Sequence, residues 1–372
     1  MSVASHAGGR LTVDLDALAW NWQQLSALAQ PGECGAAVKA NGYGLGLDPV
    51  SRTLWTAGCR SFFVALPEEA FSVRAILPDA NIYCLGGLTP GGADDYRAQK
   101  IKPVLNSLSE VRQWCEATQF APAALHVDTG MNRLGLRMDE ALALSKDKNR
   151  TSALNLSLLM SHLACADTPE HPLNGQQAER FRELKEWFPG VPASLANSAG
   201  TLLGGAYRHD LARPGIALYG GASAPVTPNP IRPVVTLEAR IIQIRKADAH
   251  EAVGYGAAET LGQAARLAIL GVGYADGYHR LAGSSDDRKG AHVSFGGKRA
   301  PLVGRISMDL MAVDITGPDF DHLSAGDYAT LIGTEIGVDD PARHAQTIGY
   351  EFLTGLGHRL ERRYIGGSRA AQ

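Results

Sequence analysis

The sequence predicts an α/β protein in which a (β/α)₈ barrel of the TIM type is followed by a C-terminal, mostly-β domain. The chain has 372 residues, which is enough for two domains. Eight short apolar runs alternate with helix-like segments between residues 34 and 220, and such a barrel needs eight strand–helix units. After Gly221 the helical periodicity ends, and apolar or alternating runs follow one another directly.

The barrel elements are predicted from their hydrophobic patterns. The strands are expected at Cys34–Ala40, Ser61–Leu66, Asn81–Gly86, Lys102–Leu105, Ala123–Val127, Leu156–His162, Ala193–Asn197 and His209–Arg213. The helices are expected at Asp48–Gly58, Pro67–Leu77, Ser107–Thr118, Met138–Lys148, Asn174–Phe188 and Ser198–Tyr207. Several of these helices begin with an N-cap residue or a proline in the first turn. A doubly wound parallel sheet is the alternative, but eight evenly spaced units favour the barrel.

The second domain is predicted to begin after a proline-rich segment, Ala222–Pro233, that is typical of a long loop or linker. Strands are expected at Val234–Ile244, Arg266–Val272, Ala291–Phe295, Ala312–Ile315 and Tyr328–Ile332. The Gly-Gly-Lys segment at 296–298 predicts a hairpin turn. We therefore place the barrel in residues 1–233 and the β domain in residues 234–372. The strand-like Leu11–Leu15 is a candidate to pair with the second domain.

Composition excludes several classes of protein. Charged residues make up 20% of the chain and the net charge is −3, which does not favour a nucleic-acid partner. The five cysteines are odd in number and form no C-x-x-C motif, so a disulfide scaffold and a zinc ribbon are not expected. The segment Met1–Arg10 has no apolar core of a signal peptide, and no long uncharged stretch is free of Pro and Gly. We expect a cytoplasmic protein without a membrane partner.

The strongest local signal for chemistry is the segment AVKANGYGLG from Ala37 to Gly46. Lys39 ends an otherwise apolar strand, and the C-terminal strand ends of such a barrel point into the active-site mouth. A lysine in an apolar setting has a lowered pKa and can form a Schiff base with a carbonyl cofactor. The alternative is a lysine whose long side chain reaches solvent from the strand end.

Other strand ends also carry polar or ionisable residues. They are Arg133 after the fifth strand, His162 at the end of the sixth, Asn197 and Ser198 at the end of the seventh, and Arg213, Gly215 and Ile216 in the eighth unit. An arginine is suited to a carboxylate, and a serine that opens a helix is suited to a phosphate. Barrels of this type often bind phosphate after strands seven and eight. Each residue also has an ordinary structural interpretation, but their convergence on one end of the barrel favours a site.

The second domain contributes two polar turns. Tyr274 lies between glycines in VGYADGY, and Met308 lies in GRISMD. Without context, a tyrosine is more often a packing residue than a catalytic one.

Together these segments resemble the alanine racemases, two-domain fold-type III enzymes that depend on pyridoxal 5′-phosphate. The resemblance runs from about Leu11 to Tyr364. It implies that Lys39 carries the cofactor as a Schiff base and that Lys39 and Tyr274 are the catalytic bases. The residues implied in cofactor binding are Lys39, Tyr43, His162, Asn197, Ser198, Arg213, Gly215, Ile216 and Tyr350. Arg133 and Met308 are implied in binding the substrate carboxylate.

The resemblance also implies a reaction and an assembly. L-alanine and D-alanine are interconverted by two bases, with Lys39 acting on the α-proton of the D-enantiomer and Tyr274 on that of the L-enantiomer. Such an isomerase supplies D-alanine for peptidoglycan or serves alanine catabolism. Arg213 is implied to face the pyridine nitrogen, where its fixed charge disfavours a protonated ring. Tyr274 and Met308 are implied to reach the site from the other subunit of a homodimer.

Two positions depart from the family pattern. Leu45 stands where the family usually has His, and His126 stands where many members have a Lys that becomes carbamylated and supports the substrate-binding Arg. Without that carbamate, the support of Arg133 must come from another anion or from a different hydrogen bond.

Several other functions remain open on the sequence alone. They are a racemase for serine, lysine or a broader set of amino acids, a fold-type III decarboxylase, and a non-catalytic pyridoxal phosphate carrier. The arginine at position 213 disfavours the decarboxylase, and the second domain disfavours the single-barrel carrier. No H-E-x-x-H or H-x-H motif occurs among the 11 histidines, so we expect no metal site.

Overall fold

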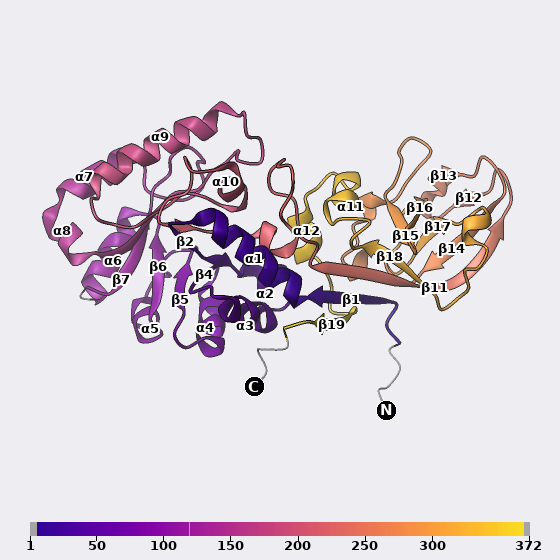
Figure 1. The fold of residues 1–372 in the computed structure, drawn as a ribbon, viewed down its shortest axis with the longest axis horizontal. Coiled ribbons are helices and arrows are strands. Elements are labelled where there is room, and N and C mark those ends of the chain that lie inside the picture. Colours follow the sequence, from indigo (N-terminus) through magenta and orange to yellow (C-terminus); the bar gives the residue numbers. More distant parts are fainter. Residues whose placement is uncertain (1–5, 119, 368–372) are drawn as a thin grey trace. The chain divides into compact units, whose positions relative to one another are not determined.

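The computed structural model describes residues 6–118 and 120–367 (Figure 1). The first five residues of the Met1–Arg10 segment and the last five of the expected second domain lie outside that part. The chain divides into two compact units. The first, here called the barrel unit, contains Leu18–Leu218 and Ala222–Ile231. The second, the β unit, contains the described residues before Leu18 together with Tyr219–Gly221 and Arg232–Gly367.

In its described residues the barrel unit contains a seven-stranded parallel sheet and a two-stranded parallel sheet. The larger sheet runs in chain order through β3 (Ala36–Ala37), β4 (Ser61–Val64), β5 (Asn81–Cys84), β6 (Ile101–Leu105), β7 (Pro122–His126), β8 (Asn155–Met160) and β9 (Ala193–Ser194). The smaller sheet pairs β10 (Leu211–Ala212) with β2 (Glu33–Cys34). These strands are almost entirely buried, as expected of parallel strands covered on both faces.

Backbone hydrogen bonds close these strands into a ring. The amide of Arg213 donates to the carbonyl of Ala196 at 2.9 Å, which joins the chain after β9 to the chain after β10. The amide of Ala37 in β3 donates to the carbonyl of Pro214 at 2.9 Å, which returns from the last strand to the first. The predicted barrel class is therefore confirmed, with all eight expected strand positions occupied.

Helices connect the barrel strands. They are α3 (Leu47–Ala57), α4 (Pro67–Ile76), α5 (Ala93–Ala98), α6 (Leu108–Thr118), α7 (Met138–Lys146), α8 (Lys148–Ala153), α9 (Pro172–Trp187) and α10 (Ser198–Leu203), with α1 (Leu15–Ala29) before the first strand. The helices α1 and α5 were not predicted from the sequence. It also predicted one helix over Met138–Lys148, whereas the chain breaks at Asp147, whose side chain accepts a hydrogen bond from Arg150 N at 3.1 Å and begins α8.

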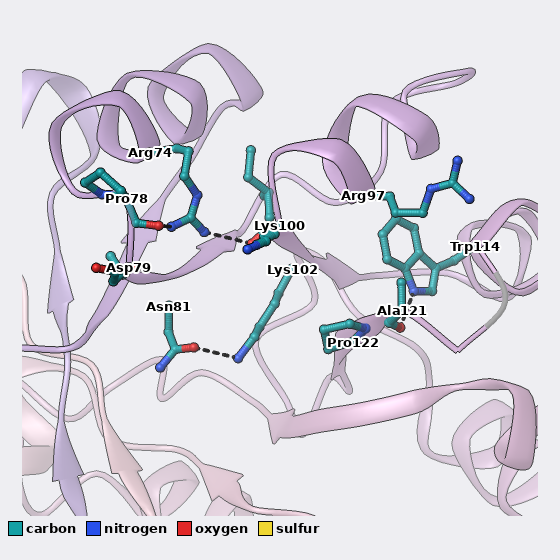
Figure 2. A pocket seen from close by; sticks show the side chains of 12 residues that line it. Arg74, Pro78, Asp79, Asn81, Arg97, Lys100, Lys102, Trp114, Ala121 and Pro122 are labelled. Atoms are coloured by element: carbon teal, nitrogen blue, oxygen red, sulfur yellow. Dashed lines mark hydrogen bonds between the residues drawn. The ribbon is translucent and has the colours of Figure 1, made fainter.

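The N-terminal ends of β5, β6 and β7 surround a pocket of about 380 Å³ (Figure 2). The Arg74 guanidinium donates to the carbonyl oxygens of Pro78 at 2.6 Å and Lys100 at 2.9 Å. These bonds tie α4 to the loops at this end. The residues predicted for a site lie at the C-terminal ends of the barrel strands. This pocket therefore lies at the opposite end of the barrel from them.

The β unit is built on one large sheet. Within the described residues its strand order is β14 (Ala265–Leu270), β17 (Met311–Asp314), β16 (Lys298–Val303), β15 (His292–Phe295), β18 (Tyr328–Ile332), β11 (Val235–Ala247), β1 (Gly9–Asp14) and β19 (Glu361–Ile365). The long strand β11 also pairs with β14, so the two ends of this strand serve different neighbours. Shorter elements are β12 (Ala252–Val253), β13 (Glu259–Thr260), α11 (Asp339–His344) and α12 (Gly349–Thr354).

The first strand of the chain is part of the β unit. β1 pairs antiparallel with β11 and parallel with β19. The hairpin between β15 and β16 turns at Gly296 and Gly297, where φ is +57° and +88°. Two consecutive residues with positive φ are characteristic of a tight hairpin turn, and glycine adopts them without strain.

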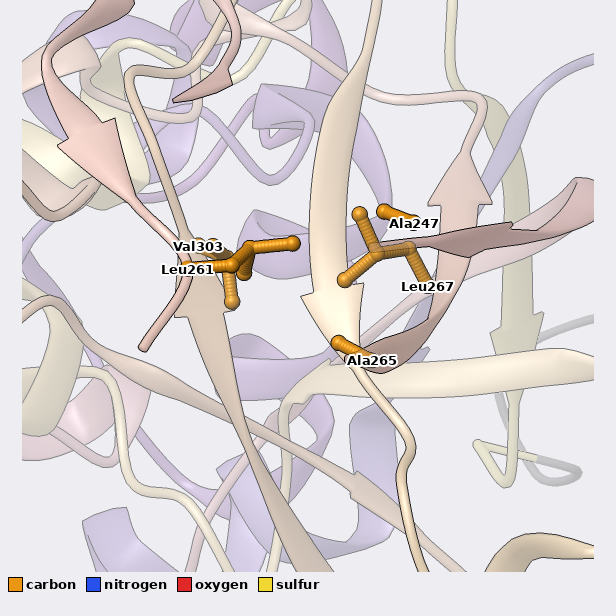
Figure 3. Close-up of a cluster of buried hydrophobic side chains, with 5 residues drawn as sticks. All are labelled: Ala247, Leu261, Ala265, Leu267 and Val303. Carbon is orange, nitrogen blue, oxygen red and sulfur yellow. The ribbon is translucent and has the colours of Figure 1, made fainter. Parts of the chain in front are cut away.

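A small apolar cluster packs beneath the far end of β11 (Figure 3). Its members are Ala247, Leu261, Ala265, Leu267 and Val303, all no more than 7% exposed. They join β11, β14 and β16, so the cluster packs at the end of β11 that pairs with β14. No helix in the described ranges is both long and apolar enough to cross a membrane.

Candidate active site

Lys39 lies at the end of the first barrel strand, at the start of a tight left-handed turn. The predicted strand Cys34–Ala40 is wrong at this end, because residues 40–43 all have positive φ, between +52° and +63°. Such conformations cost non-glycine residues free energy and persist where neighbours hold them. Here the Glu69 carboxylate accepts hydrogen bonds from Ala40 N at 2.6 Å and from Ala65 N at 2.8 Å. The turn is therefore anchored to the N-terminus of α4.

The Lys39 amine lies in a setting that disfavours its charge. Burial lowers its pKa, the nearby positive charge of Arg133 lowers it further, and Glu69 acts in the opposite direction. A lowered pKa leaves more of the amine unprotonated near neutral pH, which is the form that attacks carbonyls and accepts protons.

Three of the residues predicted for cofactor binding meet at one turn. The Ser198 hydroxyl accepts hydrogen bonds from Gly215 N at 2.8 Å and Ala217 N at 3.3 Å. A Cβ on Gly215 would lie only 2.2 Å from the Tyr43 hydroxyl oxygen, so only glycine fits at this position. Ile216, also predicted, is fully buried at the start of the short 3₁₀ helix that follows. This arrangement gathers two hydroxyls and several backbone amides, which is the chemistry of a phosphate cradle.

Asn197 acts as the N-cap of α10. Its side-chain oxygen accepts from Gly200 N at 3.0 Å and its amide nitrogen donates to the Leu163 carbonyl at 3.4 Å. A capped first turn fixes the direction of Ser198, the next residue. The structure thus gives Asn197 a positioning role beside the cradle.

Arg213 is buried in the barrel with its guanidinium surrounded by neutral acceptors. It donates to the Ser194 hydroxyl, to the Ser161 carbonyl at 2.6 Å and towards His162 Nδ1 at 3.5 Å. Burial lowers its pKa to about 9, so the group keeps its charge near neutral pH. The pKa of His162 is lowered by burial and by Arg213, which leaves the imidazole neutral.

The loop that carries Arg133 is shaped by Asp128. Its carboxylate accepts from the backbone amides of Gly130 at 2.8 Å, Met131 at 2.7 Å and Asn132 at 2.8 Å. Arg133, the next residue, is exposed, which leaves its guanidinium accessible to an anion.

His126, the departure from the family pattern, is buried against Asn106. His126 Nδ1 lies 2.8 Å from Asn106 Oδ1, while Asn106 Nδ2 donates to the carbonyls of Val104 at 2.8 Å and Leu85 at 3.3 Å. Those two carbonyls fix the amide orientation, so His126 Nδ1 must be the protonated nitrogen. Burial, followed by the charge of Arg213, lowers the pKa of His126 to about 4. A neutral imidazole therefore occupies this position.

We expect this buried His126 to make folding sensitive to acid. As the pH falls from about 6.5 to about 4, the His126 imidazole binds a proton in the unfolded chain but not in the folded chain. The free energy of unfolding therefore falls by up to about 3 kcal/mol. Above that range the contribution is constant. Urea unfolding at a series of pH values gives the free energy of unfolding at each pH. Its decrease towards acid should be smaller for His126→Gln than for the wild type, whereas His322→Gln, at an exposed position, should show the wild-type decrease. The same decrease of the free energy of unfolding in the wild type and in His126→Gln would contradict the lowered pKa of His126.

Tyr274 and Met308 lie side by side in the β unit. Tyr274 N donates to the Ser307 carbonyl at 3.1 Å and Ala275 N donates to the Met308 carbonyl at 3.0 Å. The turn is braced by Asp276, whose carboxylate accepts from Gly273 N at 2.9 Å. The side chains of Tyr274 and Met308 are 41% and 53% exposed. Tyr350, in α12, is 37% exposed.

Several residues that position these side chains within the two units were not predicted from the sequence. They are Glu69, Asn106, Ser161, Ser194 and Asp276. Glu69 had a local signal, since it is one of the two acidic residues in the first turn after Pro67, and Asn106 lies at the start signal of α6. The described residues contain no group of three or more His, Cys, Asp or Glu side chains placed to hold a metal ion.

The comparisons with known proteins agree over nearly the whole chain. Residues 13–223 match the family described as alanine racemase, N-terminal domain, and residues 234–364 match alanine racemase, C-terminal domain. The chain is 48% identical over 372 residues to the alanine racemase of Methylobacterium nodulans, covering 99% of each protein. It is 46% identical to the biosynthetic alanine racemase of Agrobacterium fabrum, covering 96% of this chain and 93% of that protein.

A solved structure is similar in both fold and sequence. It is alanine racemase from Bartonella henselae with covalently bound pyridoxal phosphate, with a TM-score of 0.90 and 38% identity. The match covers 96% of this chain and 100% of that one.

Proposed function

The chain belongs to the alanine racemase family and is an amino-acid racemase that depends on pyridoxal 5′-phosphate, and we propose that Lys39 and Tyr274 are its two catalytic bases. The observation that most supports this assignment is the half-buried Lys39 with its lowered pKa on the anchored turn. An amine held this way is suited both to bind a carbonyl cofactor and to move a proton.

The residues of the barrel unit fit the cofactor. The hydroxyls of Tyr43 and Ser198 and the amides around Gly215 and Ile216 form a cradle that suits the phosphate. Tyr350 is proposed as a further phosphate ligand. When bound, pyridoxal phosphate supplies an electron-withdrawing ring that makes the Cα proton of the attached amino acid acidic.

The two bases divide the proton transfers. Lys39 Nζ accepts the α-proton of D-alanine, and the Tyr274 hydroxyl oxygen accepts the α-proton of L-alanine. Racemisation follows when one base removes the proton and the other returns one to the opposite face. Since a free phenol titrates near 10, Tyr274 needs a positive charge nearby. Arg213, acting through the neutral His162, is the proposed source.

Arg213 and Arg133 have separate roles in this proposal. Arg213 presents to the ring nitrogen of the cofactor a donor that is charged near neutral pH, which disfavours protonation there and limits transamination. Arg133 binds the substrate carboxylate, with Met308 beside it. The position at which many family members have a carbamylated Lys holds the neutral His126, so the proposed support of Arg133 includes no carbamate there.

The activity is tested by chiral chromatography of L-alanine incubated with the purified protein and pyridoxal 5′-phosphate. D-alanine should accumulate towards an equal mixture of the two enantiomers. Parallel incubations with L-serine and L-lysine test the broader racemases. An equal or faster conversion of serine or lysine would overturn alanine as the preferred substrate.

We further propose that the enzyme is a homodimer in which Tyr274 and Met308 complete the barrel site of the other subunit. Exposed apolar side chains of the β unit support an interface there. They include Tyr274, Leu281, Met308, Leu310 and Ile348, each at least 38% exposed. Exposed apolar side chains that lie together mark interaction sites, and the backbone hydrogen bonds of Tyr274 and Ala275 place Tyr274 beside Met308.

Mixing two inactive variants should restore activity if sites are shared. Lys39→Ala and Tyr274→Phe subunits, exchanged at equal concentration, should regain about a quarter of the wild-type activity, because half of the dimers are mixed and each has one intact site. Subunit exchange is followed independently with a mass label on one variant. No recovery after proven exchange would overturn the shared site.

A further inference from the structure

The buried charge of Arg213 has no carboxylate to balance it. Within the described residues its guanidinium forms no ion pair, and its hydrogen-bond partners are a serine hydroxyl, a backbone carbonyl and a neutral histidine. A fully buried charge is costly unless dipoles or polarisable groups surround it. One further group faces it, since the ring centroid of Phe63 lies 5.9 Å from Arg213 Cζ. That distance is within the range of a cation–π interaction.

Phe63 is placed with little freedom. It lies on β4, is fully buried, and stacks on Tyr83 of β5 with ring centroids 4.9 Å apart and an angle of 12°. Gly35 makes room for the ring, because a Cβ there would lie 2.9 Å from Phe63 Cε2 and 2.8 Å from the Ser61 carbonyl oxygen. The ring position thus depends on a glycine on one side and an aromatic neighbour on the other.

A second cation, Lys102, contacts the Tyr83 end of the Phe63–Tyr83 stack. Lys102 Nζ lies 4.9 Å from the ring centroid of Tyr83 and 3.4 Å from its hydroxyl oxygen. It also donates to Asn81 Oδ1 at 3.0 Å, as Figure 2 shows. Burial raises the pKa of Tyr83 to about 12, so the phenol stays neutral and its hydroxyl remains an acceptor for Lys102. Lys102, Tyr83, Phe63 and Arg213 therefore form a continuous series from the N-terminal end of the barrel to the proposed cofactor site.

We propose that Phe63, held by Tyr83, is a positioning residue for racemisation. Its ring fixes the guanidinium of Arg213 from the side that faces the N-terminal end of the barrel. The inference rests on the proposed role of Arg213 at the ring nitrogen of the cofactor. The negative face of the Phe63 ring attracts the guanidinium and fills the space into which it would otherwise shift. An aliphatic side chain supplies no aromatic face and fills less of this space, so Arg213 moves more freely and protects the ring nitrogen less well.

The test compares Phe63→Leu with Phe62→Leu. Phe62 is the preceding residue of β4 and is equally buried, but it packs on Trp55, with ring centroids 6.5 Å apart, on the other face of the strand. Both variants lose similar core volume, so their thermal stabilities should fall alike. The specific readout is the Nε–H signal of Arg213 in NMR spectra of the substrate-free protein with cofactor bound, together with the absorption spectrum of the bound cofactor.

We expect Phe63→Leu to shift the Arg213 signal, alter the cofactor spectrum and raise the ratio of transamination to racemisation by about 5-fold, which corresponds to about 1 kcal/mol and lies within the range of cation–π interactions. Phe62→Leu should change none of these. Tyr83→Phe keeps the ring and should leave the Arg213 signal nearly unchanged. If Phe63→Leu does not fold, Phe63→Met, which fills more of the space without a ring, takes its place.

Two kinds of result distinguish a failure of the Phe63 proposal from a failure of the proposed role of Arg213. An Arg213 signal in Phe63→Leu identical to wild type, or an equal shift in Phe62→Leu, would overturn the positioning role of Phe63. A shifted Arg213 signal with unchanged spectrum and unchanged transamination ratio would instead overturn the proposed role of Arg213 at the cofactor, and with it the catalytic consequence drawn for Phe63.

Discussion

Replacing Lys39 by alanine is expected to lower the rate of alanine racemisation by at least about 10³-fold, since one side chain is proposed both to hold the cofactor and to act as a base. The loss should affect both directions. After borohydride treatment, mass spectrometry should find the cofactor on the peptide that contains Lys39 in the wild type and on no peptide of the variant.

The control for this substitution is Lys148→Ala, an exposed lysine at the start of α8. It should leave both the rate and the labelled peptide as in the wild type. Racemisation by Lys39→Ala within about 10-fold of the wild type would contradict the assignment, because removal of a general base costs more than that. So would the recovery of the cofactor on another lysine of the wild-type protein.

Replacing Tyr274 by phenylalanine is expected to lower racemisation by about 10²–10⁴-fold, because the ring is kept and only the proton-transferring hydroxyl is lost. Cofactor binding should be unchanged, since Lys39 and the cradle around Ser198 are intact. The absorption spectrum of the bound cofactor checks the second point, and coupled assays in each direction check the first.

Tyr255→Phe is the matched control for the tyrosine. Tyr255 lies in the same unit and is 70% exposed, so its hydroxyl is at least as accessible as that of Tyr274. Its substitution should leave the rate unchanged. A Tyr274→Phe variant that racemises alanine as fast as Tyr255→Phe does would remove Tyr274 from the mechanism.

The barrel could be predicted because each of its strands is a short run of apolar residues. Strands such as Ser61–Val64 are buried on both faces, so hydrophobicity alone marks them. The missed helix Leu15–Ala29 did have a start signal, since Asp14 accepts a hydrogen bond from Ala17 N at 2.9 Å. The strand-like residues directly before it obscure that signal, because their alternating pattern runs into the start of the helix.

The geometry of the site was less predictable than its composition. Lys39, Ser198 and Gly215 could be selected from their positions at strand ends, but the left-handed turn after Lys39 could not. Ala40 and Asn41 carry a Cβ that disfavours positive φ, so no local rule predicts this conformation. It is imposed by Glu69, which is close only in the folded chain.

The support of the buried charges was also beyond sequence reasoning. Ser194 and Phe63 contact Arg213 from strands that are well separated in the chain, and Asn106 fixes the tautomer of His126 across two strands. None of these residues belongs to a recognisable motif. Each acquires its role only because closure of the barrel brings its strand beside the others.

The two-base assignment is tested most directly by following the α-proton of each alanine enantiomer by NMR in D₂O with the Tyr274→Phe variant. Lys39 remains in this variant, so the α-proton of D-alanine should exchange with solvent deuterium without change of configuration. The α-proton of L-alanine should persist. Rapid exchange from L-alanine, or exchange from neither enantiomer while Lys39 still holds the cofactor, would contradict the assignment of Lys39 and Tyr274 to opposite faces of the substrate.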